Sequence, residues 1–109
     1  MTDYTDAYVT IATFNERENL PLVLPLIAEN APGLTVIVVD DDSPDGTGEW
    51  VDEFARQHEW VKVMHRPRKS GYASAHTQGM QQAIEWGARR LLTMDADLSH
   101  DPAVLPAIL

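Results

Sequence analysis

The chain has 109 residues, of which 44% are hydrophobic, and this is enough for one domain with a buried core. Its 17 acidic and 8 basic residues give a formal net charge of -9, which argues against a nucleic-acid-binding surface because phosphate backbones are not attracted to it. The absence of cysteine excludes disulfides, zinc thiolate sites and thiol nucleophiles, so the chemistry must come from oxygen and nitrogen atoms.

The hydrophobic pattern predicts strands and helices in alternation, within one domain. Apolar runs rich in β-branched residues predict strands at 8–13, 34–39, 61–65 and 90–94. Helical spacing and turn residues predict helices at 20–29, after the turn at 43–46, and at 74–86. Asp101 and Pro102 are typical of an N-cap and a first helical residue, and they predict a last helix that the sequence cuts off at Leu109.

Two of these helices carry local signals about their shape and packing. Pro25 lies inside the first predicted helix and, because proline lacks a backbone donor, it predicts a late start or a kink. The helix at 74–86 repeats small residues at a spacing that lets it lie close to a sheet, at Ala75, Gly79 and Ala83. Aromatic residues at helical spacing are expected in the core, namely Trp50, Phe54 and Trp86.

The alternating order predicts an α/β fold with an open parallel Rossmann-like sheet of about four strands and helices on both faces. If the first three strands run outward on one side and the fourth returns beside the first, the strand order is 3-2-1-4. The topological switch point then lies between the first and fourth strands, where ligands of such sheets bind. This places a crevice between Glu16, which follows the first strand, and Asp95, which follows the fourth.

Asp95 and Asp97 are the strongest chemical signal in the sequence. Two carboxylates one residue apart at a strand end supply the oxygen ligands that Mg2+ or Mn2+ prefers. Asp-x-Asp also arises by chance, and aspartate at a strand end often caps the next helix. The position opposite two other acidic strand ends favours the metal site. For His100, which lies three residues further, a structural or solvated role is favoured over a metal ligand.

The second strand end carries three adjacent acids, which repel one another unless a ligand, a cation or hydrogen-bond donors lie between them. We expect Asp41 to contact a nucleoside and Asp40 to support the loop. Asp42 and Asp45 suit a solvated turn. Glu16 has two equally weighted interpretations, a negative charge at a helix start and a contact with the ligand.

Residues 65–71, with the sequence HRPRKSG, form the only basic run in the sequence. Two interpretations stay open, an exposed loop and a segment that guides phosphates toward the crevice. The sequence has no Ser-His-Asp order, no P-loop lysine motif and no GxGxxG. Hydrolase, P-loop NTPase and dinucleotide-binding functions therefore lack their required parts.

Four segments, taken in this order and spacing, resemble the N-terminal half of family 2 glycosyltransferases of the GT-A fold: VTIATFNERENLPL, VIVVDDDSPDGTGEW, HRPRKSGYASAHTQGMQQA and LLTMDADLSHDP. The likeness covers nearly the whole chain. It is strongest to dolichol-phosphate or polyprenol-phosphate mannosyltransferases, because SPDGT and DADLSHDP are specific to that branch. It implies that residues 1–109 are the donor-binding part of a transferase domain, truncated after the Asp-x-Asp motif.

The resemblance implies transfer of mannose from GDP-mannose to a polyprenyl or dolichyl phosphate, with inversion at the anomeric carbon and a Mg2+ or Mn2+ ion as cofactor. It also implies a cytoplasmic protein that is peripheral to the cytoplasmic membrane face. Two sequence features agree with this location: no apolar run approaches the roughly 20 residues of a membrane span, and the acidic start is wrong for a signal peptide. The family's acceptor-contacting parts lie in sequence that is not present here, so turnover by this chain alone is an open question.

Position by position, the family's first-strand motif Pro-x-Tyr-Asn-Glu falls on residues 12–16, where Ala12 replaces the proline and Phe14 the tyrosine. A third departure is Ala73, where the family has the second glycine of Gly-Leu-Gly. The resemblance assigns the catalytic and metal-binding roles to Asp95 and Asp97. It assigns donor contacts to eight residues: Ala12, Phe14, Glu16, Val39, Asp41, Asp95, Ala96 and Asp97.

Two alternatives come from other functional classes. A response-regulator receiver domain also places an acidic pair after an apolar strand, but there the pair ends the first strand and a later strand-end lysine is needed. No lysine follows Lys69. The other alternative is a non-catalytic or truncated nucleotide-sugar-binding module, which fits the departures at Ala12 and Ala73.

An open sheet edge also predicts self-association as a homo-oligomer.

Overall fold

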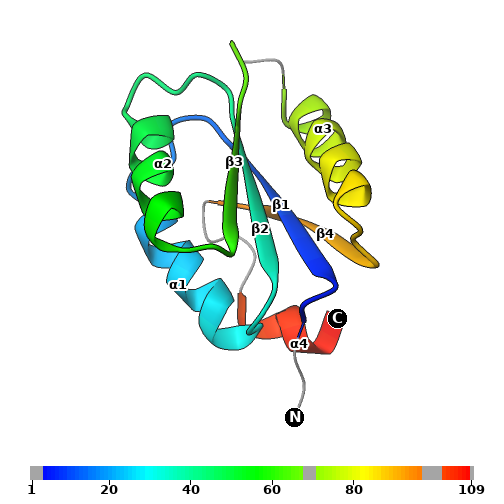
Figure 1. Cartoon of the computed structure of the whole chain (residues 1–109). Helices are drawn as coiled ribbons and strands as arrows, with labels where there is room; N and C mark the ends of the chain where they lie inside the picture. The colour runs from blue at the N-terminus through cyan, green and yellow to red at the C-terminus, as the bar shows by residue number, and fades with distance from the viewer. Residues whose placement is uncertain (1–3, 68–70, 97–101, 109) are drawn as a thin grey trace.

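The computed structural model describes residues 4–67, 71–96 and 102–108, which form strands and helices in alternation (Figure 1). The strands are β1 (Ala7–Thr13), β2 (Thr35–Asp40), β3 (Val61–His65) and β4 (Arg90–Asp95). The helices are α1 (Leu20–Asn30), α2 (Thr47–Gln57), α3 (Tyr72–Glu85) and α4 (Leu105–Ile108), the last preceded by the 3-10 turn η1 (Pro102–Val104). None of the helices in this described part is long and apolar enough to cross a membrane.

The strands form one parallel sheet in the order β3-β2-β1-β4. The helices α1 and α2 cover one face of the sheet, and α3 covers the other (Figure 1). The predicted α/β fold class and strand order are therefore confirmed. The topological switch point lies between β1 and β4, so the carboxyl ends of these two strands border the crevice in which such sheets bind ligands.

The core consists of two apolar layers, one on each face of the sheet. β1 and β2 lie in the middle and are covered on both faces, which explains their nearly continuous runs of apolar residues. The larger layer packs against α1 and α2 and includes Val9, Ile11, Leu20 and Leu24. The smaller layer lies beneath α3 and consists of Ala12, Ile37, Val39, Ala75 and Ala83. The central strands, and with them the residues at their carboxyl ends, are thus held from both sides.

Gly79 brings α3 into close contact with the sheet. A Cβ atom at this position would lie 2.8 Å from Thr10 Cγ2 and 3.2 Å from Val39 Cγ2, and the first of these is shorter than Cβ atoms tolerate. Ala75 and Ala83, one turn before and one turn after, are buried. The predicted role of the small-residue stripe is confirmed.

Gly79→Ala should lower the free energy of unfolding by about 1–2 kcal/mol. Overpacking against β-branched side chains on a central strand costs about 1–3 kcal/mol, and the roughly 1 kcal/mol that alanine gains over glycine in a helix offsets part of this cost. Urea denaturation followed by circular dichroism measures the difference. Gln81→Ala, at an exposed position of the same helix, is the matched control and should change stability by less than about 0.5 kcal/mol. A stabilised Gly79→Ala variant would contradict the close approach of α3.

Trp86 does not lie in the predicted core: 47% of its surface is exposed. It is the C-cap of α3, and the chain turns at Gly87 (φ 94°) directly after it, so the helical spacing that predicted its burial ends before it. Trp50 and Phe54 are partly buried against the larger core layer, and their rings stack with centroids 5.1 Å apart. The core prediction was therefore wrong for Trp86 and partly confirmed for the other two.

Two expectations about helix starts also need correction. α1 begins at Leu20, as the predicted range 20–29 had it, and continues through Pro25, so the late-start alternative is wrong. Pro25 is exposed, and the bond that its missing N–H forgoes would have gone to the carbonyl of Pro21 in the first turn. Pro102 opens the turn η1, and the α-helix begins only at Leu105. The predicted N-cap Asp101 lies outside the described residues.

Candidate functional site at the carboxyl edge of the sheet

The strand register places the acidic strand ends side by side at one edge of the sheet. Ala12 of β1 is level with Asp95 of β4, and Thr13 of β1 is level with Asp40 of β2. His65 of β3 is level with Asp40 on the other side. Because neighbouring strands lie about 4.8 Å apart, the ends of β2 and β4 are separated by about 10 Å, with β1 between them. Such an edge can hold an extended ligand across three strands.

Asp40 supports the loop after β2. Its side chain is buried, and it accepts hydrogen bonds from Thr13 Oγ1 (2.7 Å), from Ser43 Oγ (2.6 Å) and from the Ser43 backbone N–H (3.1 Å). A buried carboxylate with three donors is well compensated for the loss of water. The expectation that Asp40 has a structural role is confirmed. Asp42 is exposed and adopts a left-handed backbone (φ 55°), as expected for a turn residue.

Asp41 forms a buried ion pair with Arg66, the residue that follows β3. Arg66 Nε donates to Asp41 Oδ1 (2.6 Å) and Nη2 donates to Asp41 Oδ2 (3.0 Å), which is the bidentate geometry of the strongest such pairs. Both side chains are only 6% exposed. The guanidinium group also donates to Ser74 Oγ (2.8 Å), Gln78 Oε1 (3.3 Å) and the carbonyl of Gly71 (3.4 Å). Arg66 thus joins the end of β2 to the start of α3.

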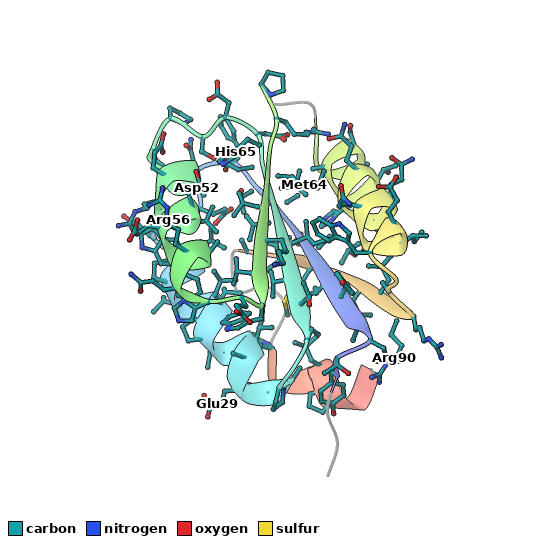
Figure 2. The ribbon with its side chains drawn as sticks, in the orientation of Figure 1. Glu29, Asp52, Arg56, Met64, His65 and Arg90 are labelled. Atoms are coloured by element: carbon teal, nitrogen blue, oxygen red, sulfur yellow. The ribbon has the colours of Figure 1, made fainter. Side chains whose placement is uncertain are left out.

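The basic run at 65–71 is therefore divided between two environments. The exposed-loop interpretation is wrong for Arg66, which is buried, and its charge is directed at Asp41. His65 is exposed and contacts Asp52 of α2, with Nε2 2.8 Å from Asp52 Oδ1. Figure 2 shows His65 on the side of α2, whereas Met64, its neighbour along β3, points to the opposite side. Residues 68–70 lie outside the described residues.

The loop after β1 is bonded to the residues that begin α1. Asn15 adopts a left-handed backbone (φ 60°). The half-buried Glu16 accepts a hydrogen bond from Asn19 Nδ2 (2.8 Å) on its carboxylate, and its carbonyl accepts one from Leu20 N–H (3.0 Å). Glu16 therefore precedes α1, whose first turn contains no acidic residue, so neither of its two interpretations is confirmed. Phe14 precedes these residues and is half-buried.

Asp95 is half-buried at the end of β4, and His76 of α3 is close enough to sense its charge. Burial lowers the pKa of the His76 imidazole from its usual 6.5, and the negative charge of Asp95 partly opposes this shift. Nδ1 of His76 and Oγ1 of Thr10 share a hydrogen bond of 2.8 Å. His76 is thus held in place as a mainly neutral group between α3 and the sheet.

The sequence predicted a site for a divalent cation at this edge of the sheet. The Asp95 carboxylate supplies the type of oxygen ligand that Mg2+ and Mn2+ prefer. Within residues 4–67, 71–96 and 102–108, there is no cluster of three or more acidic, histidine or cysteine side chains that could hold a metal ion. The described part therefore supplies Asp95, and the predicted second ligand Asp97 lies outside it, as does His100. A cation at this edge would need oxygen ligands from a bound diphosphate as well.

Four of the predicted donor contacts are buried, and one of them is Asp41, whose carboxylate is paired with Arg66. Ala12 and Val39 are 4% and 0% exposed and pack beneath α3, and Ala96 is 2% exposed. The exposed fraction counts backbone and side chain alike, so these three residues offer a ligand almost no accessible atom in this structure. The roles of all eight predicted donor-binding residues stay predictions.

The amino-acid sequence was also compared with known proteins. The profile of glycosyl transferase family 2 matches residues 8–109. The chain belongs to this family. It is 46% identical over 99 residues to an undecaprenyl-phosphate mannosyltransferase of Micrococcus luteus, covering 91% of this chain and 41% of the relative. It is 45% identical over 106 residues to a polyprenol monophosphomannose synthase of Mycolicibacterium smegmatis, covering 93% and 38%. A dolichol-phosphate mannosyltransferase of Pyrococcus furiosus is 40% identical over 103 residues, covering 93% and 28%.

Solved structures of similar fold are GT-A glycosyltransferases. A mannosyltransferase from Pyrobaculum calidifontis, solved in complex with GDP-Man and Mn2+, superposes with a TM-score of 0.70 at 26% identity, covering 89% of this chain and 30% of that one. GalNAc-T7, solved with UDP, GalNAc and Mn2+, has a TM-score of 0.67 at 24% identity over 83% of this chain and 18% of that one, which shows a shared fold alone.

The chain spans about 40% or less of the length of the curated relatives that it matches. The membership in glycosyl transferase family 2 excludes the receiver-domain alternative, and it confirms the predicted family.

Proposed function

We propose that this chain is the donor-binding part of a glycosyltransferase that transfers mannose from GDP-mannose to a polyprenyl phosphate. The observation that carries the proposal is the 40–46% identity, over more than nine-tenths of the chain, to relatives named as mannosyltransferases or synthases of undecaprenyl, polyprenol and dolichol phosphates. The mannosyltransferase complex with GDP-Man and Mn2+ supports the choice of donor. The acceptor lipid implies a site at the cytoplasmic face of a membrane.

The carboxyl edge of the sheet suits such a donor. The Asp41 side of the edge takes the nucleoside, and the Asp95 side takes the diphosphate and the sugar, since about 10 Å of sheet separates these two strand ends. Phe14 and Glu16 border the nucleoside from the loop after β1, and the buried Ala12, Val39 and Ala96 lie behind them at the strand ends. Asp95 and Asp97 hold the divalent ion. The net charge of -9 makes this ion necessary, because a polyanionic donor is otherwise repelled.

The reaction is an inverting displacement. An oxygen of the acceptor phosphate forms a bond to the anomeric carbon while the bond from that carbon to the β-phosphate oxygen breaks, and its electron pair leaves with the nucleoside diphosphate. The acceptor phosphate is already anionic, so the chain need not supply a strong general base. The residues at the carboxyl edge orient the donor for this attack. A bound divalent cation supplies the positive charge that stabilises the departing diphosphate.

Calorimetric titration of the chain tests the proposal. GDP-mannose, UDP-glucose and UDP-N-acetylglucosamine are titrated separately, each with Mn2+ and with a chelator. We expect GDP-mannose to bind in the presence of Mn2+ and to lose its affinity in the chelator, whereas the two UDP sugars bind more weakly. Absence of binding by a demonstrably folded chain would contradict a competent donor site and would favour the truncated, non-catalytic alternative. Preference for a UDP sugar would refute the assignment of the donor.

A further inference from the structure

Three successive backbone N–H groups of the loop after β1 donate to side chains of the turn after β2. The bonds run from Asn15 N to Ser43 Oγ (3.0 Å), from Glu16 N to Thr47 Oγ1 (3.1 Å) and from Arg17 N to Asp45 Oδ2 (3.2 Å). We call Ser43, Asp45 and Thr47 the loop clamp. In surface loops such N–H groups usually donate to water, whereas here all three donate to side chains of a neighbouring turn. The clamp thus fixes the path of the loop over three consecutive residues.

The acceptor atoms of the loop clamp are themselves held in place. Ser43 is bonded to the buried Asp40 through both its hydroxyl and its N–H. The Thr47 hydroxyl and N–H both donate to Asp45 Oδ1, so the free electron pairs of this hydroxyl can face the N–H of Glu16. Gly46 between them has φ 88°, a backbone that suits glycine in this tight turn.

Asp45 accepts its hydrogen bonds as a carboxylate. Desolvation opposes its ionisation, but the bonds from the Thr47 hydroxyl and from the Arg17 and Thr47 N–H groups outweigh this effect and lower the pKa of Asp45 below its usual 3.8. Bonds to a charged acceptor are stronger than those between neutral groups. The loop also contacts α2 through a cation–π interaction, because the Arg17 guanidinium lies 5.4 Å from the centre of the Trp50 ring.

We propose that Ser43, Asp45 and Thr47 are positioning residues for the donor nucleoside. They hold Asn15 in its left-handed backbone, and thereby set the positions of Phe14 and Glu16 on either side of it. The loop clamp acts through the loop after β1 and does not itself touch the donor. The inference rests on the proposed donor site, and it gives the Ser-Pro-Asp-Gly-Thr turn a part in nucleoside binding.

Thr47→Val in the full chain tests the clamp, since valine keeps the shape of threonine and removes the acceptor for Glu16 N–H. The first readout is amide hydrogen exchange without any ligand, in which the Asn15, Glu16 and Arg17 amides should exchange at least about 5-fold faster. The second readout is the Kd of GDP-mannose with Mn2+, which should rise about 5- to 10-fold, as expected for a loosened binding loop that lost one hydrogen bond.

Two further variants separate positioning from general stability. Thr47→Ser restores a hydroxyl at the same place and should return both readouts to within about 2-fold of the unmodified chain. Thr77→Val makes the same chemical change on α3, where the hydroxyl is exposed and donates to the Ala73 carbonyl of its own helix. It should leave both readouts unchanged.

The outcomes are distinguishable. Unchanged exchange of the three loop amides in Thr47→Val would overturn the clamp itself. Faster exchange with an unchanged Kd would overturn its role in donor binding and leave the donor site intact. If the unmodified chain binds no donor, the proposed function fails and the positioning role falls with it, whatever the exchange pattern.

Discussion

Arg66→Met should lower the free energy of unfolding by about 3–5 kcal/mol, because it leaves the buried Asp41 carboxylate without its counter-charge. The substitution also removes the bonds from the guanidinium group to Ser74 and Gln78, which tie α3 to the strand ends. Methionine retains much of the side-chain volume, so the loss is one of charge and hydrogen bonding more than of packing. Urea denaturation monitored by circular dichroism gives the difference directly.

A second variant and a control determine whether the ion pair between Arg66 and Asp41 is the cause of the lost stability. Arg66→Met combined with Asp41→Leu removes both charges and should recover much of the lost stability, since a buried pair replaced by apolar groups is often close to neutral. Arg56→Met removes an arginine from an exposed pair with Glu53 on α2, and it should cost no more than about 1 kcal/mol. Equal effects of Arg66→Met and Arg56→Met would refute the buried ion pair.

The sequence was sufficient to predict the sheet and the edge that carries the site. The strand order follows from four apolar runs, the helices between them and the right-handedness of crossovers. Asp40, Asp41 and Asp95 were placed on one edge because each of them ends or directly follows a strand. The register confirms this for Asp40, which is level with Thr13, and for Asp95, which is level with Ala12. These inferences needed only local patterns and one rule of topology.

The pairing of side chains across the edge of the sheet could not be predicted from the sequence. Arg66 is separated from Asp41 by 25 positions, and a basic run between two elements is usually an exposed loop. Its burial follows from the parallel register of β2 and β3, which brings the residue after one strand beside the residue after the other. The one local signal was that Asp41 and Arg66 each lie just beyond a predicted strand end.

The same limit applies to the loop clamp and to Trp86. Ser43 and Asp45 were predicted as part of a turn and Thr47 follows it, but the bonds of these three residues to the loop after β1 span 28 to 31 positions and depend on the adjacency of β1 and β2. Trp86 lies just beyond the last residue of α3, at the C-cap, and Gly87 with its positive φ follows it, so the helical spacing does not extend to this residue. Patterns within one element were therefore reliable away from its ends, and contacts between elements required the register.

Asp95→Asn should weaken Mn2+-dependent binding of GDP-mannose by at least about 100-fold. This expectation rests on the proposed site, in which Asp95 is a direct ligand of the ion. Removing a residue that only hydrogen-bonds to a metal ligand already lowers metal affinity by about 10–100-fold. Asparagine at position 95 would lack both the charge and the second oxygen of the carboxylate. The same loss is expected for Asp97→Ala. Calorimetric titration with Mn2+ measures the effect, and in a chelator the unmodified chain and the variants should bind equally weakly.

Glu29→Gln provides the matched control for this prediction, because it exchanges a carboxylate for an amide at an exposed position on α1. Figure 2 shows Glu29 at the end of the molecule opposite to His65, so it lies far from the carboxyl edge of the sheet. Both variants lose one negative charge, and the overall attraction of the chain for Mn2+ falls by the same small amount in each. The two variants should therefore differ in Mn2+-dependent affinity only if the Asp95 carboxylate contacts the ion. Retention of Mn2+-dependent affinity by Asp95→Asn, at the level of Glu29→Gln, would remove Asp95 from the donor site.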